Sequence, residues 1–196
     1  MGDDVIVGAD GLARCRWGAE PEVYREYHDG EWGRPLRGDD ELFERISLEA
    51  FQSGLSWLTI LRRREGFRAA FDGFRIEAVA AYTDADVERL LGDTGIIRNR
   101  AKIVATIANA KAARKLDDGL TALIWSFAPA GHVRPQAIGD VPAVTPESTA
   151  LSKALKREGF RFVGPTTAYA MMQAIGMVDD HLAGCHVAAG QASEIR

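Results

Sequence analysis

Two cysteines and two of the four histidines in this chain of 196 residues are placed where they could share a metal ion. Cys15 and His28 lie near the N-terminus, whereas His181 and Cys185 lie near the C-terminus, four residues apart. On a helix, that spacing would put His181 and Cys185 on one face, one turn apart. Two thiolates and two imidazoles form the ligand set of a closed structural zinc site. Such a site would tie the two ends of the chain together.

Taken alone, this pattern leaves zinc open. A histidine and a cysteine four residues apart occur by chance, and the spacing from Cys15 to His28 is not that of a standard zinc finger. His186, which follows Cys185 directly, is a less favoured alternative to His181 as a ligand. Two cysteines also make no disulfide framework, and a chain that works inside the cell rarely keeps a disulfide.

Glu49 is a carboxylate on an apolar helical stripe. It follows Leu42 by seven residues and Ile46 by three, so it should face inward with them. Because an ionised carboxylate is costly to bury without a partner, such a residue needs a partner or a purpose. Glu49 is therefore either one half of a structural salt bridge or the acid of a binding pocket.

Aromatic residues around Glu49 favour the pocket. Tyr24 and Tyr27 share one helical face. Aromatic faces beside one buried carboxylate would hold a flat, cationic, hydrogen-bonding ring by stacking and charge compensation. The candidate pocket aromatics are Trp17, Tyr24, Tyr27 and Trp57. Trp32 and Trp125, in contrast, are expected to be ordinary core residues.

Two further segments could contact a partner. Gly54 and Ser56 flank Leu55, which would be exposed as an apolar wedge. Residues 155–172 read as helix, short turn, helix, with Arg161 in the turn. The second helix of this hairpin begins after Gly164, and helix N-termini bind anions such as phosphate. Thr166 and Thr167 add hydroxyl groups there. A plain pair of antiparallel helices is the alternative interpretation.

Helical signals dominate the elements that must position these residues. We expect a helix over residues 42–53 that ends at Gly54, and another within residues 97–116. Helix starts are predicted at Asp39 or Asp40, at Thr83 or Asp84, at Thr145 before Pro146, and at Gly164 before Pro165. Strand signals are weak, so the prediction is an all-α protein of about seven to nine helices.

Composition favours one soluble domain. Hydrophobic residues make up 46% of the chain, and no apolar run approaches the length of a membrane helix. The first eleven residues hold three aspartates and no basic residue, so we expect no targeting signal and a cytoplasmic location. With a net charge of −4, any contact with nucleic acid must come from local basic clusters. The candidates lie at residues 62–64, 98–102 and 153–161.

Several long motifs resemble the DNA-3-methyladenine glycosylase I family. They lie, in order, at residues 13–17, 24–33, 48–57, 95–103, 159–164 and 179–185. The resemblance covers about residues 13–188, nearly the whole chain. It implies a helix-hairpin-helix DNA glycosylase fold with one bound structural zinc ion. Relatives often carry glutamine where this chain has Phe51, and the tail after Cys185 differs.

The resemblance also implies roles for individual residues. The zinc ligands fall on Cys15, His28, His181 and Cys185, and the base-recognition glutamate, which we take as the catalytic residue, falls on Glu49. The pocket aromatics fall on Trp17, Tyr24, Tyr27 and Trp57. The hairpin falls on residues 155–172 and the wedge inserted into DNA falls on Leu55. We accordingly expect DNA contacts from Gly54, Leu55, Ser56, Arg161, Gly164, Thr166 and Thr167.

Together these inferences predict a monofunctional N-glycosyl hydrolase of base excision repair. It would flip 3-methyladenine out of double-stranded alkylated DNA and release it as the product, without strand cleavage. We expect a monomer with no membrane contact, in which residues 1–12 are a flexible extension, residues 13–188 form one domain and residues 189–196 are a flexible tail. The alternatives are a non-catalytic module that binds damaged DNA, and a zinc-held helical scaffold with an inert pocket.

Overall fold

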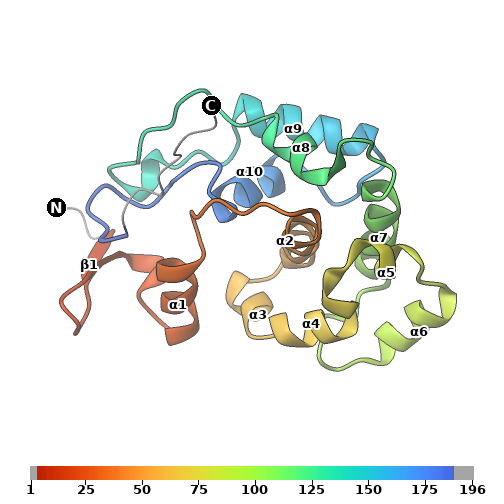
Figure 1. The fold of residues 1–196 in the computed structure, drawn as a ribbon. Coiled ribbons are helices and arrows are strands. Elements are labelled where there is room, and N and C mark those ends of the chain that lie inside the picture. The colour runs from red at the N-terminus through yellow and green to blue at the C-terminus, as the bar shows by residue number, and fades with distance from the viewer. Residues whose placement is uncertain (1–3, 188–196) are drawn as a thin grey trace.

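A computed structural model describes residues 4–187 of the chain. Among these residues, helices predominate and one small sheet is present (Figure 1). The strands are β1 Val5–Val7 and β2 Ala13–Cys15. The α-helices are α1 Glu22–Gly30, α2 Asp39–Gln52, α3 Trp57–Leu61, α4 Arg64–Ala70, α5 Ile76–Ala80, α6 Asp84–Gly92, α7 Arg100–Ala113, α8 Gly119–Trp125, α9 Pro146–Arg157 and α10 Pro165–Ala174. Three short 3-10 helices lie at Arg16–Gly18, Asp72–Phe74 and Ile138–Asp140.

Helix α2 is the central helix of the fold. It contacts α3, α5, α7, α8 and α10, and Figure 1 shows it in the middle of the molecule. Its apolar side chains, including Leu42, Phe43 and Ile46, are fully or almost fully buried in the main core. Because neighbours surround α2 on several sides, even a polar residue in its second half is taken out of water.

Asp39 and Asp40 are in the first turn of α2, but neither is its N-cap, so this prediction is wrong. The N-cap is Gly38. Asp39 instead accepts hydrogen bonds from the backbone N–H groups of Leu120 (3.0 Å) and Thr121 (2.8 Å) at the start of α8. Asp40 accepts one from the N–H of Ile76 (2.8 Å) at the start of α5. Each aspartate thus satisfies free donors of a different helix and fastens that helix to α2.

The other predicted helix starts are confirmed. Thr83 precedes α6 and exchanges capping-box hydrogen bonds with Asp86. Thr145 caps α9, with Pro146 at the first helical position. Gly164 precedes α10, again with a proline in the first turn. These signals succeed because each depends on a few adjacent residues.

The all-α prediction is wrong at the N-terminus, where β1 and β2 pair antiparallel, with Val5 opposite Cys15. Residues 4–12 supply the first strand and the turn of a hairpin that β2 completes, whereas a flexible extension was expected over residues 1–12. Val5 packs against a second small core that contains Cys15, Leu182 and Cys185. Residues 1–3 of the expected extension and the expected tail at 189–196 lie outside the described residues. Partial burial of Val5 against this core stabilises the strand, since an apolar side chain gains stability when water is excluded from it.

No helix within residues 4–187 has both the length and the apolar composition that crossing a membrane requires.

Candidate functional site

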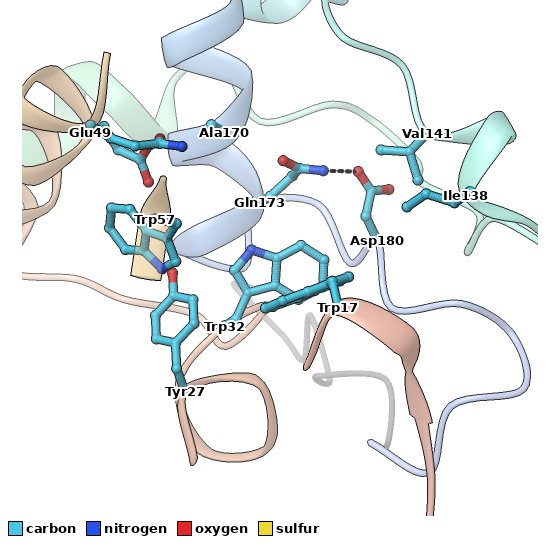
Figure 2. A pocket seen from close by; sticks show the side chains of 11 residues that line it. Trp17, Tyr27, Trp32, Glu49, Trp57, Ile138, Val141, Ala170, Gln173 and Asp180 are labelled. Carbon is cyan, nitrogen blue, oxygen red and sulfur yellow. Dashed lines mark hydrogen bonds between the residues drawn. The ribbon is translucent and has the colours of Figure 1, made fainter. Parts of the chain in front are cut away.

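A pocket of about 240 Å³ lies between α1, α2, α3, α10 and the 3-10 helix Ile138–Asp140 (Figure 2). Its size suits one small heterocycle better than a large ligand. Aromatic rings form much of the wall, and polar side chains are placed at separate points around it. The lining residues are Trp17, Tyr27, Trp32, Glu49, Gln52, Trp57, Ile138, Val141, Ala170, Gln173 and Asp180.

Glu49 is the buried acid of this pocket, with 5% of its surface exposed. Burial raises the pKa of its carboxyl to about 7, and the positive charge of Arg45 opposes only part of that rise. Among residues 4–187, no side chain forms an ion pair or hydrogen bond with Glu49. Arg45 instead donates to the Tyr27 hydroxyl (3.1 Å) and lies 3.7 Å from Glu31. The salt-bridge interpretation of Glu49 is thus not supported within the described part of the chain.

Three of the four predicted aromatics line the pocket. The rings of Tyr27 and Trp57 are 5.6 Å apart, and Trp17 lies farther along the wall. Tyr24 is not among the lining residues. Its hydroxyl accepts a hydrogen bond from the backbone N–H of Leu58 (2.8 Å), so Tyr24 anchors the start of α3.

Trp32 is buried, as expected, in a small core with Tyr27, Leu61 and Ala174, and it also lines the pocket. Its ring meets that of Trp17 edge to face, with centroids 4.9 Å apart. Trp32 follows directly after α1, and the chain turns there so that the indole faces Trp17 rather than the main core. Trp125 packs against the main core but is only partly buried, with its indole N–H donated to the carbonyl of Leu36 (3.1 Å).

Cys15, His28 and Cys185 form a buried cluster whose possible ligand atoms all lie within 4.8 Å of one another. The Sγ atom of Cys185 is 3.5 Å from Nε2 of His28. Hydrogen bonds from Cys15 and from His28 lower the pKa of the Cys185 thiol below its usual range.

His181 lies beside this cluster, with its ring 4.8 Å from that of His28, but outside the three-residue group. Its Nε2 is 3.3 Å from the carbonyl oxygen of His28. His181 and Cys185 do not lie on a helix, because residues 177–187 are irregular. A turn closed by the N–H of Cys185 on the carbonyl of Leu182 (2.8 Å) brings Cys185 back instead.

Both histidine rings are held in a similar way, each by a carboxylate close to its Nδ1 atom. Nδ1 of His28 is 2.7 Å from Asp29, and Nδ1 of His181 is 2.8 Å from Asp179. Carboxylates on Nδ1 leave Nε2 as the ligand atom, which is the usual arrangement around metal-bound histidines. Two glycines make room for the rings. A Cβ at Gly18 would overlap His28, and one at Gly33 would lie 2.7 Å from His181.

The loop after α2 presents Leu55 to solvent, with 40% of its surface exposed. Gly54 has a φ of +82°, a conformation that favours glycine. The Ser56 hydroxyl accepts the N–H of Thr59 (3.2 Å) and caps α3. Lys102 secures the loop from below, because its ammonium group donates to the carbonyls of Phe51 (2.7 Å) and Ser53 (2.6 Å).

The predicted hairpin is present as α9, a tight turn and α10. Asn109 of α7 grips the turn by accepting the N–H of Arg161 (2.7 Å) and donating to its carbonyl (3.1 Å). The Ser152 hydroxyl donates to the carbonyl of Val163 (2.6 Å). The side chains of Arg161 and Thr166 are exposed, so they remain accessible at the surface.

Residues 17–188 match the sequence profile of the family described as methyladenine glycosylase. This chain belongs to that family. It is 46% identical to the DNA-3-methyladenine glycosylase 1 of Escherichia coli K12, over 89% of this chain and 96% of the relative.

Solved structures agree with this assignment to the methyladenine glycosylase family. A crystal structure of 3-methyladenine DNA glycosylase I is 45% identical and superposes with a TM-score of 0.85, covering 88% of this chain and 98% of that one. A Staphylococcus aureus 3-methyladenine DNA glycosylase I, described in terms of how it recognises 3-methyladenine, is 35% identical, with a TM-score of 0.85 and coverage of 89% and 95%.

In this methyladenine glycosylase, Phe51 is part of the core and not of the pocket. It is fully buried, with its ring 4.6 Å from that of Phe67. The basic clusters are partly used within the protein. Arg64 pairs with Glu31 and Arg100 with Glu88, each at 2.6 Å. The hairpin cluster therefore retains more of its charge for an external partner.

Sequence reasoning missed the polar and apolar residues on the far side of the pocket. These are Gln52, Ile138, Val141, Ala170, Gln173 and Asp180. One signal was available, because Gln173 lies four residues after Tyr169 and therefore on the same face of α10. Ile138 and Val141 lie in the largely irregular stretch between α8 and α9, where no periodicity in the sequence indicates which side chains face inward.

Proposed function

We propose that this protein hydrolyses the N-glycosidic bond of 3-methyladenine in double-stranded alkylated DNA. The observation that carries the proposal is Glu49, a buried carboxylate without an ion-pair partner among residues 4–187, placed in a pocket walled by aromatic rings. Membership of the methyladenine glycosylase family and the 3-methyladenine activity named for its relatives support it.

The pocket chemistry suits a cationic purine. Methylation at N3 gives adenine a positive charge, so the base leaves as a neutral molecule and need not be protonated. Tyr27 and Trp57 can stack on a planar ring, while Glu49 compensates its charge. Because Glu49 is desolvated, its attraction for a cation is stronger than that of a carboxylate in water.

The target base must leave the duplex to reach this pocket, at a cost of a few kcal/mol. We propose that Leu55 fills the gap that the base leaves. Gly54 and Ser56 hold it in an exposed turn for this purpose. The hairpin would grip the DNA backbone. Backbone N–H groups after Gly164, with Arg161, Thr166 and Thr167, offer donors and a positive charge to phosphate.

The proposed reaction is hydrolysis without strand cleavage. A lyase would need an amine at the pocket to form a Schiff base. None of the lining residues that the structure describes is a lysine. Lys102 is buried, and it is committed to the carbonyls of Phe51 and Ser53.

We also propose one structural zinc ion held by Cys15, His28, His181 and Cys185. Three of these donors already lie together, and the carboxylates on both histidines support the assignment. The ion would supply a rigid link between segments that are far apart in sequence. His186 fits less well, because its Nε2 lies 3.2 Å from Asp29, which also contacts His28. The expected cytoplasmic location and monomeric state stay predictions.

Base release from alkylated duplex DNA tests the proposed activity. The wild-type protein should release free 3-methyladenine, and Glu49→Gln should lower the rate by roughly a hundredfold or more, since a buried charge that faces the cation is lost. Released bases are separated and identified by chromatography. Glu41→Gln, on the exposed face of the same helix, should keep wild-type activity.

Two results would contradict this proposal. Full activity of Glu49→Gln would remove Glu49 from the mechanism. DNA binding without base release by the wild-type protein would favour a non-catalytic module that senses damage, and no DNA binding at all would favour an inert scaffold.

A further inference from the structure

A second carboxylate, Asp180, lies at the end of the pocket that the proposed function does not use. It is 3% exposed. Its Oδ2 accepts hydrogen bonds from the Tyr169 hydroxyl and from Nε2 of Gln173, both at 2.7 Å. Nε2 of His132 lies 3.0 Å from its other oxygen, Oδ1, but the hydrogen bond of that nitrogen is to the Asp179 carbonyl (3.0 Å), and Oδ1 has no hydrogen-bond partner among the described residues. Asp180 is thus held through Oδ2, and Gln173 contacts it from within the pocket wall (Figure 2).

This contact fixes the orientation of the Gln173 side-chain amide. A carboxylate can only accept hydrogen bonds, so the NH₂ group of Gln173 must face Asp180. The amide oxygen then lies on the opposite side of the group, as Figure 2 shows. Within residues 4–187, no donor is bonded to that oxygen. Gln173 therefore offers the pocket its amide oxygen as an acceptor, while one of its two N–H donors is held by Asp180.

The pocket consequently carries the Glu49 carboxylate on α2 and the Gln173 amide oxygen on α10 as acceptors, and Oδ1 of Asp180 adds a further acceptor beside Gln173. A ligand that binds both Glu49 and Gln173 must bring at least two hydrogens. The exocyclic 6-amino group of an adenine carries two hydrogens, whereas the oxygen at position 6 of a guanine carries none. A 6-oxo group would place its lone pairs against acceptors that had been desolvated, which is unfavourable.

We propose that Gln173 is a specificity-determining residue that accepts a hydrogen bond from the 6-amino group of the flipped base and disfavours 6-oxo purines. Asp180 is the positioning residue that keeps the amide in this orientation. The inference rests on the proposed function. It identifies the 3-methylpurine that the pocket selects and the atoms that make the selection.

The test uses duplex DNA treated with a methylating agent, which carries both 3-methyladenine and 3-methylguanine. The readout is the ratio of kcat/KM for release of the two bases by one enzyme preparation. In wild type, 3-methyladenine should be released at least tenfold faster. Gln173→Met keeps the length of the side chain but removes the acceptor, and we expect this ratio to fall about tenfold.

Two further variants separate specificity from structure. Gln136→Met makes the same change at an exposed glutamine outside this pocket, and the ratio should stay as in wild type. Asp180→Asn can face either side of the Gln173 amide, so the orientation is no longer fixed and the ratio should also fall. Thermal unfolding of each variant confirms that it is folded.

An equal loss of both activities in Gln173→Met, with the ratio unchanged, would overturn the inference, because it indicates only a change in pocket shape. An unchanged ratio in Asp180→Asn, beside a lowered one in Gln173→Met, would refute the positioning role. Absence of any base release by wild type would instead contradict the proposed function, so the two failures are distinguishable.

Discussion

At the scale of single residues, Glu49 is held by packing rather than by a partner. Core side chains on α2 such as Ile46 carry it inward, while Arg45, four residues earlier on the same helix, is engaged with Tyr27. A carboxylate kept in this way is energetically unfavourable until a cation arrives. The protein therefore gives up stability at the position where the proposed reaction needs attraction for a charged base.

This cost has a pH dependence of known sign. Burial raises the pKa of Glu49 from 4.5 to about 7, so between these values the folded protein holds a proton that the unfolded chain has released. The free energy of unfolding therefore falls as the pH rises through this window. Above it, the ionised carboxylate costs about 3 kcal/mol. Glu49→Gln should be more stable than wild type by about 3 kcal/mol at pH 8, and by little at pH 4.5.

Urea unfolding at both pH values measures this difference. Glu41→Gln, at an exposed position of α2, serves as the control and should show the same small difference at both. A stability gain for Glu49→Gln that did not change with pH would mean that the carboxyl titrates normally in the folded protein.

At the scale of elements, the corner between α2 and α3 positions both Glu49 and Leu55. The last carbonyls of α2 have no partner within the helix, and Lys102 of α7 supplies one to Phe51 and Ser53. The exposed loop at residues 54–56 therefore rests on a buried ammonium group. Sequence analysis placed Lys102 in a basic surface cluster, and it did not anticipate this role.

Lys102→Met should lower the free energy of unfolding by about 2 kcal/mol, because buried carbonyls lose a charged donor. It should also raise KM for alkylated DNA, since the loop that carries Leu55 is less firmly held. Lys111→Met, at an exposed position of the same helix, is the matched control. Equal stability of the two variants in urea unfolding would show that Lys102 has no supporting role.

At the scale of the whole molecule, the segments near the two termini form one unit. β2 leads into Cys15, and the N–H of His186 is donated to the carbonyl of Ala13 (2.7 Å). Trp17 and Asp180, which line the same pocket, belong to these two segments. Whatever joins the segments therefore also holds part of the pocket wall.

For this reason we expect metal removal to affect both stability and activity. Purified protein should contain one zinc ion per chain by elemental analysis, and chelation should lower Tm by on the order of 10 °C. His181→Ala should lose the ion, whereas His186→Ala should retain it. The opposite result would make His186 the fourth ligand, and folded, active protein without zinc would refute the site.

The sequence by itself determined the local elements and the residue types of the site. The starts of α6, α9 and α10 follow from caps and prolines a few residues apart, and the stripe through Leu42 and Ile46 turned Glu49 inward. These signals are local because they depend on the backbone conformation of neighbouring residues.

Only the tertiary structure decided where donors and acceptors meet. Asp39 caps α8 from 81 residues away, Tyr24 supports α3 instead of the pocket, and Trp32 joins the pocket wall. The amide oxygen of Gln173 is available as an acceptor because Asp180 binds the NH₂ group of the same amide. Hydrogen bonds of this kind depend on distances between elements that are remote in sequence, and no local pattern of residues encodes those distances.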